Sequence, residues 1–170
     1  MINMKEKTRD TSEQELAKTE CVLQAHFTEE FKAFILEHNG CSVERNIIRI
    51  SENEDNALRY FLDVKDIPAC LSSLQDDYTQ KHYFPFAEGE CGAFFLMKKQ
   101  GDPGIYYYDP DYMGQDAMTK LSDDWQGFLD KIQPETTDLS EADQQALSKA
   151  VVWVRPGFLE SLDKKYLIKK

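Results

Sequence analysis

The chain has 170 residues, of which 41% are hydrophobic and 12% aromatic, and its formal net charge is −11. This hydrophobic content is enough to build a buried core, so a wholly disordered chain is excluded, and the length fits one domain. The negative charge disfavours nucleic acid and anionic membranes as partners. It favours a basic protein, although solubility alone also explains an acidic composition.

Nothing in the sequence indicates a membrane or secretory segment. No apolar run approaches the roughly 20 residues that span a bilayer, and residues 1–19 are charged, unlike a secretory signal. We therefore expect a cytoplasmic protein with reduced cysteines. The expected division is a flexible N-terminus (1–10), one domain (11–133) and a C-terminal helical extension (134–170) packed on the same domain.

The N-terminal part predicts two helices. Thr11-Ser12 and Thr28 are each followed by acidic residues, which is typical of a helix start. Asn39-Gly40 is expected to end the second helix, because glycine suits the left-handed position beyond the last turn. The residues that follow the helical period are Leu16, Thr19, Val22 and Leu23 in the first helix and Phe31, Phe34, Ile35 and His38 in the second.

The next segments predict a hairpin and a third helix. Residues 43–50 and 57–64 are strand candidates on either side of an acidic turn. Asp66 is a candidate cap for one helix through about Tyr78. Strict alternation in the second strand places Leu58, Tyr60, Leu62 and Val64 on one side and Arg59, Phe61 and Asp63 on the other.

An aromatic stretch from Tyr83 to Asp111 predicts a three-stranded meander. Its strand segments are separated by the turns Gly89-Glu90-Cys91-Gly92 and Gly101-Asp102-Pro103-Gly104. Within the last strand, alternation places Tyr107 opposite Tyr106 and Tyr108. We therefore expect at least one of these tyrosines to be more exposed than its neighbours, as an interface anchor.

The C-terminal part predicts helices. After a polar loop at 111–116, Ser122 is expected to cap a helix whose buried stripe is Trp125, Phe128, Leu129 and Ile132. A linker around 134–137, a helix from Ser140 to about Trp153 and an amphipathic element at 158–167 complete the chain. The expected fold class is α+β: two N-terminal helices, a central antiparallel or mixed sheet of about five or six strands, and C-terminal helices packed on it.

The usual signatures of catalysis and metal binding are absent from the sequence. The three histidines, His26, His38 and His82, have no partner at metal-binding spacing. The acidic pairs lack the calcium-loop pattern, and the glycine turns lack the Lys-Ser/Thr of a phosphate loop. Nucleophilic pairs of Cys41 with His38 or Cys91 with His82 lack an orienting third group. We therefore assign no catalytic, cofactor or metal residues, and keep a Cys91/His82 hydrolase only as an alternative.

The order of these segments resembles the SMI1/KNR4 family of the SUKH superfamily over roughly residues 13–132. The quoted segments are Phe31 to Gly40, which is similar to a family helix ending in Asn-Gly-Gly, Phe84 to Gly92, Gly104 to Asp109, and Leu121 to Leu129. Cys41 replaces the second family glycine, and Gly92-Ala93 replaces the usual Gly-Asp or Gly-Asn.

The resemblance implies a non-catalytic bacterial immunity protein that binds and neutralises a polymorphic or contact-dependent toxin. A basic nuclease-type toxin is the expected partner, with the chain as a monomer or homodimer. The alternative is a cytoplasmic adaptor or regulatory scaffold of the same family type. The expected toxin-binding residues are acidic and aromatic, with Trp125 assigned to the core instead: Asp109, Asp111, Tyr107, Tyr112, Asp116, Asp123 and Asp124.

Overall fold

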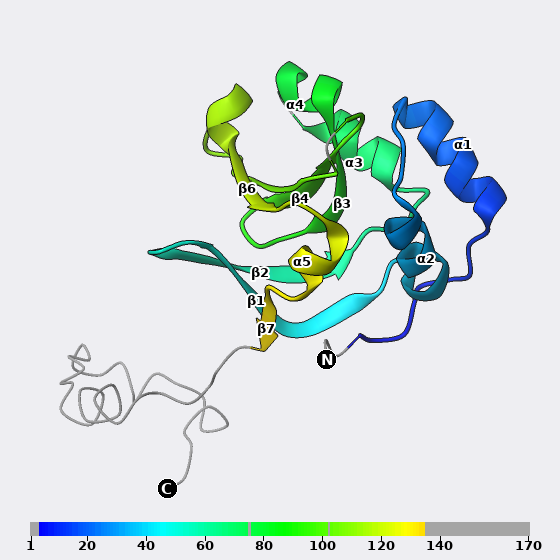
Figure 1. Ribbon diagram of the computed structural model, residues 1–170, viewed down its shortest axis with the longest axis horizontal. Coiled ribbons are helices and arrows are strands. Elements are labelled where there is room, and N and C mark those ends of the chain that lie inside the picture. The colour runs from blue at the N-terminus through cyan, green and yellow to red at the C-terminus, as the bar shows by residue number, and fades with distance from the viewer. Residues whose placement is uncertain (1–3, 75, 102, 135–170) are drawn as a thin grey trace, which may run out of the picture. The chain divides into compact units, whose positions relative to one another are not determined.

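The structure is a computed structural model that describes residues 4–74, 76–101 and 103–134 (Figure 1). The predicted helix from Ser140 and the amphipathic element at 158–167 lie outside the described residues. The division of the chain near residue 133 therefore stays a prediction.

The described part of the chain contains a seven-stranded sheet with the order β6-β5-β4-β3-β2-β1-β7. Every pair of neighbours in it is antiparallel. The α+β class is confirmed, with a strand or two more than expected and no mixed pairing. The strands are β1 (Ser42–Ser51), β2 (Glu54–Phe61), β3 (Tyr83–Glu88), β4 (Phe94–Lys98), β5 (Ile105–Tyr108), β6 (Met118–Ser122) and β7 (Ile132–Pro134).

The predicted N-terminal helices are α1 (Glu13–Leu23) and α2 (Glu29–His38), and both begin where the sequence predicts. The side chains of Ser12 and Thr28 accept hydrogen bonds from backbone N–H groups in the first turns. Gly40 has a φ of +66°, the left-handed conformation expected after α2. The predicted apolar stripe of the first helix is wrong at Val22, which is 61% exposed rather than buried.

The single helix expected from Asp66 to Tyr78 is wrong. The structure has α3 (Ile67–Ser73) and α4 (Asp77–His82), separated by Leu74 in extended conformation. Asp66 makes no side-chain capping bond. Asp76 instead caps the second helix, because its carboxylate accepts a hydrogen bond from Tyr78 N.

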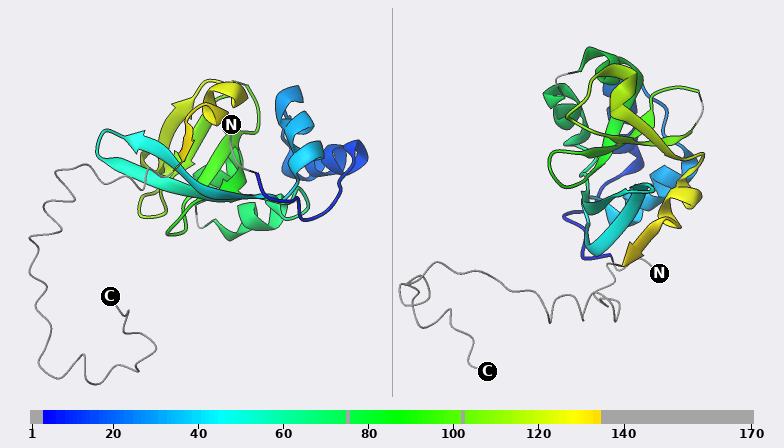
Figure 2. Two further views of the ribbon diagram at one scale, coloured as in Figure 1. Left: turned by 90° about the horizontal axis from the view of Figure 1, so that it is seen from below. Right: turned by 90° about the vertical axis from the view of Figure 1, so that its left-hand side faces the viewer.

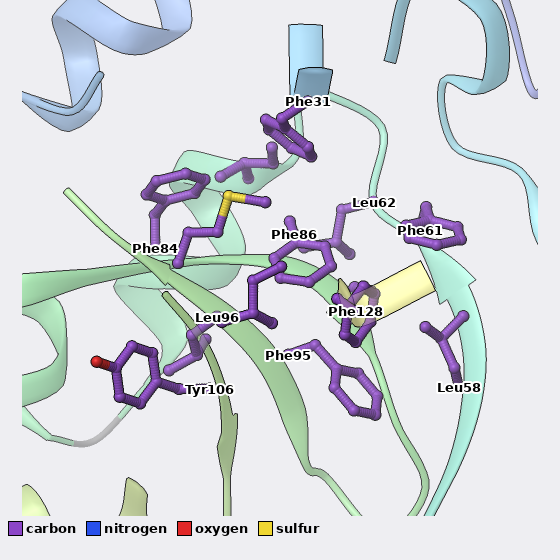
Figure 3. Packing of buried hydrophobic residues seen from close by; sticks show 14 of the residues in the cluster. Phe31, Leu58, Phe61, Leu62, Phe84, Phe86, Phe95, Leu96, Tyr106 and Phe128 are labelled. Atoms are coloured by element: carbon purple, nitrogen blue, oxygen red, sulfur yellow. The ribbon is translucent and has the colours of Figure 1, made fainter. Parts of the chain in front are cut away.

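The centre of the sheet is buried on both faces. On one face, Phe31 of α2 and Trp125 of α5 (Trp125–Leu129) pack against Phe86 of β3. Tyr83 and Phe86 are three residues apart in β3, so their side chains point to opposite faces of the sheet. On the other face, Tyr83 contacts Tyr78 of α4. Figure 1 shows α5 within the curl of the sheet, and Figure 3 shows the aromatic cluster from close by.

This double cover corrects the prediction for the tyrosine strand. Tyr106, Tyr107 and Tyr108 are 9%, 5% and 5% exposed, so none of them offers an exposed ring. β5 lies between β4 and β6, and side chains on both of its faces are covered. Alternation in this strand distinguishes two buried faces rather than an inside from an outside.

The β1–β2 hairpin forms as predicted, and it reaches away from α1 and α2 (Figure 2). The strict alternation predicted for its second strand fails at Phe61, which is fully buried, as is Leu58 three residues before it. The pairing of β1 with β2 shifts register between Ser42 and Asn46. Such an irregularity re-aims side chains, and Phe61 packs against Phe34 of α2.

The predicted C-terminal helix starts later and ends earlier than expected. Residues 118–122 form strand β6, and Asp124, not Ser122, is the N-cap of α5. Ile132 is buried as predicted, but it belongs to β7 rather than to a helical stripe. β7 extends into the expected linker, where Pro134 pairs with Asn46 of β1.

Residues 4–10, expected to be flexible, run along the domain with specific contacts. Met4 pairs with Val43, and Thr8 N donates to the carbonyl oxygen of Asn39 at 3.0 Å. Arg9 Nη2 lies 2.7 Å from carboxylate oxygens of both Glu15 and Asp63. These bonds attach the segment to α1 and to the residues after β2.

Candidate protein-binding surface

Two large exposed apolar side chains lie next to each other in the segment between β5 and β6, residues 109–117, which we name the Tyr112 loop. Tyr112 is 56% exposed and Met113 is 71% exposed. Asp111 and Asp116 are also exposed, and Asp109 is half-buried. The loop thus presents two large apolar side chains between carboxylates, which is the composition of a protein contact rather than of a core.

The buried carboxylate of Asp76 attaches this loop to the domain by hydrogen bonds. Its Oδ2 accepts a hydrogen bond from Gly114 N at 3.0 Å, while its carboxylate also accepts from Thr79 Oγ1 and Tyr78 N. Gln115 Nε2 donates a second bond across to the Tyr78 hydroxyl at 3.2 Å. The loop is therefore fixed to α4 at its 3₁₀ turn, η1 (Gly114–Ala117).

The Asp76 carboxylate is ionised although it is only 5% exposed. Burial raises its pKa, but the hydrogen bonds from Thr79, Gly114 and Tyr78 outweigh that effect and lower the pKa overall. An anion held by neutral donors makes the attachment directional, because each donor has to point at the carboxylate.

The two ends of the loop are also tied together. Asp109 N donates to the carbonyl oxygen of Ala117 at 2.9 Å, which extends the β5–β6 pairing by one step. The Asp109 carboxylate accepts from Asp111 N at 2.9 Å. Gly114 has a φ of +63°, a conformation that favours glycine. Tyr112 and Met113 are thus presented on a braced loop, which lowers the entropic cost of binding.

Six of the seven predicted binding residues fall into two groups at opposite ends of β6; the seventh, Tyr107, lies within β5. Asp109, Asp111, Tyr112 and Asp116 precede the strand, whereas Asp123 and Asp124 follow it. Five strand residues span about 16 Å, so the two groups do not form one tight cluster.

The second group has local structural partners. Asp123 pairs with Lys120 at 2.5 Å, and Asp124 accepts from Gly127 N at 2.7 Å as the cap of α5. Tyr107 is buried, and its hydroxyl accepts from Asn56 Nδ2 at 3.1 Å. Burial raises the pKa of Tyr107 to about 12, with smaller contributions from nearby acids. Trp125 is 5% exposed, which confirms its assignment to the core.

The structure separates Cys91 from His82, one of the two candidate nucleophile pairs. His82 directly precedes β3, and Cys91 lies beyond its other end. The six residues of β3 therefore separate them by about 20 Å. Cys91 is exposed at a turn with φ of 56°, not packed as a strand residue. Cys41 is fully buried, and burial raises the pKa of its thiol to about 11, which disfavours the reactive thiolate near neutral pH.

Two further features of the described residues bear on function. In that part of the chain, no three or more His, Cys, Asp or Glu side chains are grouped as metal ligands would be. Over the same residues, no helix has both the length and the apolar character needed to cross a membrane.

Sequence reasoning missed the buried residue that supports this surface and one of the exposed residues on it. Asp76 was absorbed into a single continuous helix, although an Asp directly before Asp77 and Tyr78 is a typical capping signal. Met113 was passed over beside Tyr112, because a lone apolar residue in a polar loop carries no periodicity. The signal available for it was its place next to an exposed aromatic residue.

Comparison with known families identifies the family of this chain. The family model described as the SMI1 / KNR4 family (SUKH-1) matches residues 10–131. No curated protein matches the chain.

Proposed function

Because the chain belongs to the SMI1/KNR4 family (SUKH-1), we propose that it is a non-catalytic immunity protein that neutralises a cognate toxin by binding it. Membership of this family is consistent with an immunity-type protein. The identity of the partner class, a polymorphic or contact-dependent toxin, is part of the proposal.

The observation that carries the proposal is the exposure of Tyr112 and Met113 on a braced loop. Tyrosine is enriched among the residues that contribute most to protein binding, and methionine adapts its shape to an apolar partner. Asp111 and Asp116 stand beside them, so the contact has an apolar centre with an acidic rim.

The charge supports a basic partner. Nuclease toxins carry basic surfaces because they hold phosphate, and a chain of net charge −11 attracts such a surface at long range. Association should therefore be fast at low salt and slower as the salt concentration rises. We retain the Tyr112 loop as the contact and do not carry buried Tyr107 into it.

In the first experiment, the full-length chain is immobilised and incubated with lysate of its host. The inactivated product of any neighbouring toxin gene is added to that lysate. We expect one basic toxin-like protein to be retained, and to be released between about 0.1 M and about 0.5 M salt. Co-expression then tests neutralisation, since the active toxin should stop growth only when this chain is absent.

Matched variants place the contact. Replacing both Tyr112→Ala and Met113→Ala should weaken toxin binding by a factor of about 100 or more, because central apolar anchors typically contribute at least about 2 kcal/mol each. Val22→Ala removes another exposed apolar side chain, on α1, and should bind like the wild type.

One result would contradict the immunity function, and another would contradict the proposed contact. Retention of ordinary cellular proteins only, with no protection from the neighbouring toxin, favours the adaptor or scaffold alternative. Full protection by the Tyr112→Ala, Met113→Ala variant keeps the immunity function but moves the contact away from the Tyr112 loop.

A further inference from the structure

A groove runs between α1 and α2, away from the Tyr112 loop in the fold. Its volume is about 460 Å³. Each helix contributes four residues spaced i, i+3, i+4 and i+7, so the groove follows one stripe of each helix. The lining residues are Glu13, Leu16, Ala17 and Glu20 from α1 and Glu29, Lys32, Ala33 and Leu36 from α2.

The floor of the groove is lined by apolar side chains, two of them small. Leu16 is buried, Leu36 is half-buried, and Ala17 and Ala33 are exposed. Both alanines line the groove, and their side chains of one carbon leave room in it. Small residues at such positions allow the backbone of another helix to approach closely, and half-buried Leu36 offers it apolar contact.

The rim of the groove is acidic. Glu13, Glu20 and Glu29 stand against one base, Lys32. Lys32 Nζ lies 3.4 Å from Glu20 Oε1 and 3.3 Å from Glu29 Oε1, so its charge is already compensated within the groove. Glu20 also accepts a hydrogen bond from Phe27 N at 2.7 Å, which fixes it at the junction of the two helices.

We propose that the α1–α2 groove is a second docking site, which binds an amphipathic helix of a partner protein. The apolar face of that helix places leucine-like side chains over Ala17 and Ala33, and lysine or arginine residues beside its apolar stripe meet Glu13 and Glu29. This site does not depend on the Tyr112 loop or on the partner being a toxin.

The test uses a defined probe. A fluorescent peptide of about 15 residues, made of leucine, lysine and alanine in amphipathic order, is compared with a scrambled peptide of identical composition by fluorescence anisotropy on the full-length chain. Because both peptides carry the same charge, non-specific attraction to an acidic protein affects them equally. We expect the amphipathic peptide to bind at least about tenfold more tightly.

Variants locate the binding. Ala33→Arg and Ala17→Arg each place a long cationic side chain in the groove and should each weaken amphipathic-peptide binding about tenfold or more. Both alanines are exposed, so arginine fits the helix surface without disturbing the core. Val22→Arg adds the same charge about half a helical turn away from the groove stripe and should bind like the wild type. Circular dichroism checks that each variant remains folded.

The outcomes separate the alternatives. Equal binding of the two peptides, or unchanged binding by both groove variants, overturns the proposal. An altered oligomeric state in Ala33→Arg with unchanged peptide binding assigns the groove to a second copy of this chain and overturns it as well. The Tyr112→Ala, Met113→Ala variant should bind the peptide normally, so failure here is distinct from failure of the proposed toxin contact.

Discussion

Two buried carboxylates hold peripheral segments against the domain, and they do so by different chemistry. Asp63 is 7% exposed and holds residues 8 and 9, whereas Asp76 is 5% exposed and holds the Tyr112 loop. Asp63 has a charged partner: Arg9 contacts both of its oxygens, at 2.8 Å and 2.7 Å. The donors to Asp76 are neutral backbone and hydroxyl groups.

The difference shows how each segment should respond to its surroundings. Burial disfavours ionisation of both carboxylates, and hydrogen bonds more than compensate, so both pKa values are lowered. The Arg9 side chain is 31% exposed, so dissolved ions reach the first attachment. The attachment of the Tyr112 loop depends on donor geometry instead and should be insensitive to salt.

The largest expected effect comes from Asp63→Ala. Removing this carboxylate breaks the buried Arg9 pair and weakens the attachment of the N-terminal segment, so we expect the free energy of unfolding to fall by about 3 kcal/mol. Urea denaturation measures it. Arg49→Ala breaks an exposed pair with Asp55 and should cost less than about 1 kcal/mol. An equal loss of unfolding free energy in the two variants would show that the buried pair stabilises the fold no more than an exposed pair does.

A pair of left-handed glycines extends the comparison to the backbone. Gly40 and Gly114 have φ of +66° and +63°, so alanine is strained at both. Gly114→Ala has open space and should cost about 1 kcal/mol of unfolding free energy. A Cβ at Gly40 would collide with the Thr8 side chain, so Gly40→Ala should cost about 2 kcal/mol, part of it from displacing the N-terminal segment. Identical melting temperatures for the two variants would contradict this.

Salt separates the two attachments directly. We expect the cost of Asp63→Asn to shrink by roughly 0.5 kcal/mol between about 0.05 M and about 1 M NaCl, because added ions screen the Arg9 pair. The cost of Asp76→Asn should stay constant within error over that range. Urea midpoints measured for both variants and the wild type provide the data. The same salt dependence in both variants would remove the distinction.

Acid pH gives the smallest effect. The pKa of each carboxylate is lowered from 3.8, so its stabilisation is complete above that value and is lost as the pH falls through the folded-state pKa. Asp76→Asn and Asp63→Asn each remove one such group. The variants should therefore lose less stability than the wild type between about pH 4 and about pH 2.5. If the free energy of unfolding fell with pH in the same way for all three proteins, other acidic residues would determine the loss of stability at low pH.

The sequence predicted elements whose signals are local. Ser12 and Thr28 begin helices because their hydroxyls satisfy first-turn N–H groups, and Gly40 ends one because its conformation suits glycine. These rules involve only a few neighbouring residues. The family resemblance came from the order of such segments, and it is confirmed over residues 10–131.

Tertiary contacts decided the rest. Of the five residues of β6, only Leu121 is buried, so the strand shows no apolar alternation in the sequence. It is a strand because it pairs with β5. The tyrosine strand was misread because sequence does not reveal that a sheet is covered on both faces. In the candidate site, exposed Tyr112 was predictable, whereas the support from Asp76 depends on contact with Gly114, which lies 38 residues away.

The double cover of the central strands also has an evolutionary consequence. Every residue of β5 is buried, so a substitution there alters packing and offers nothing new to a binding partner. The Tyr112 loop has the opposite property, since Tyr112 and Met113 face solvent and the support beneath them comes mainly from Asp76 and Gly114. A lineage that keeps those two supporting residues is free to exchange the exposed ones, and thereby to acquire a different partner without redesigning its scaffold.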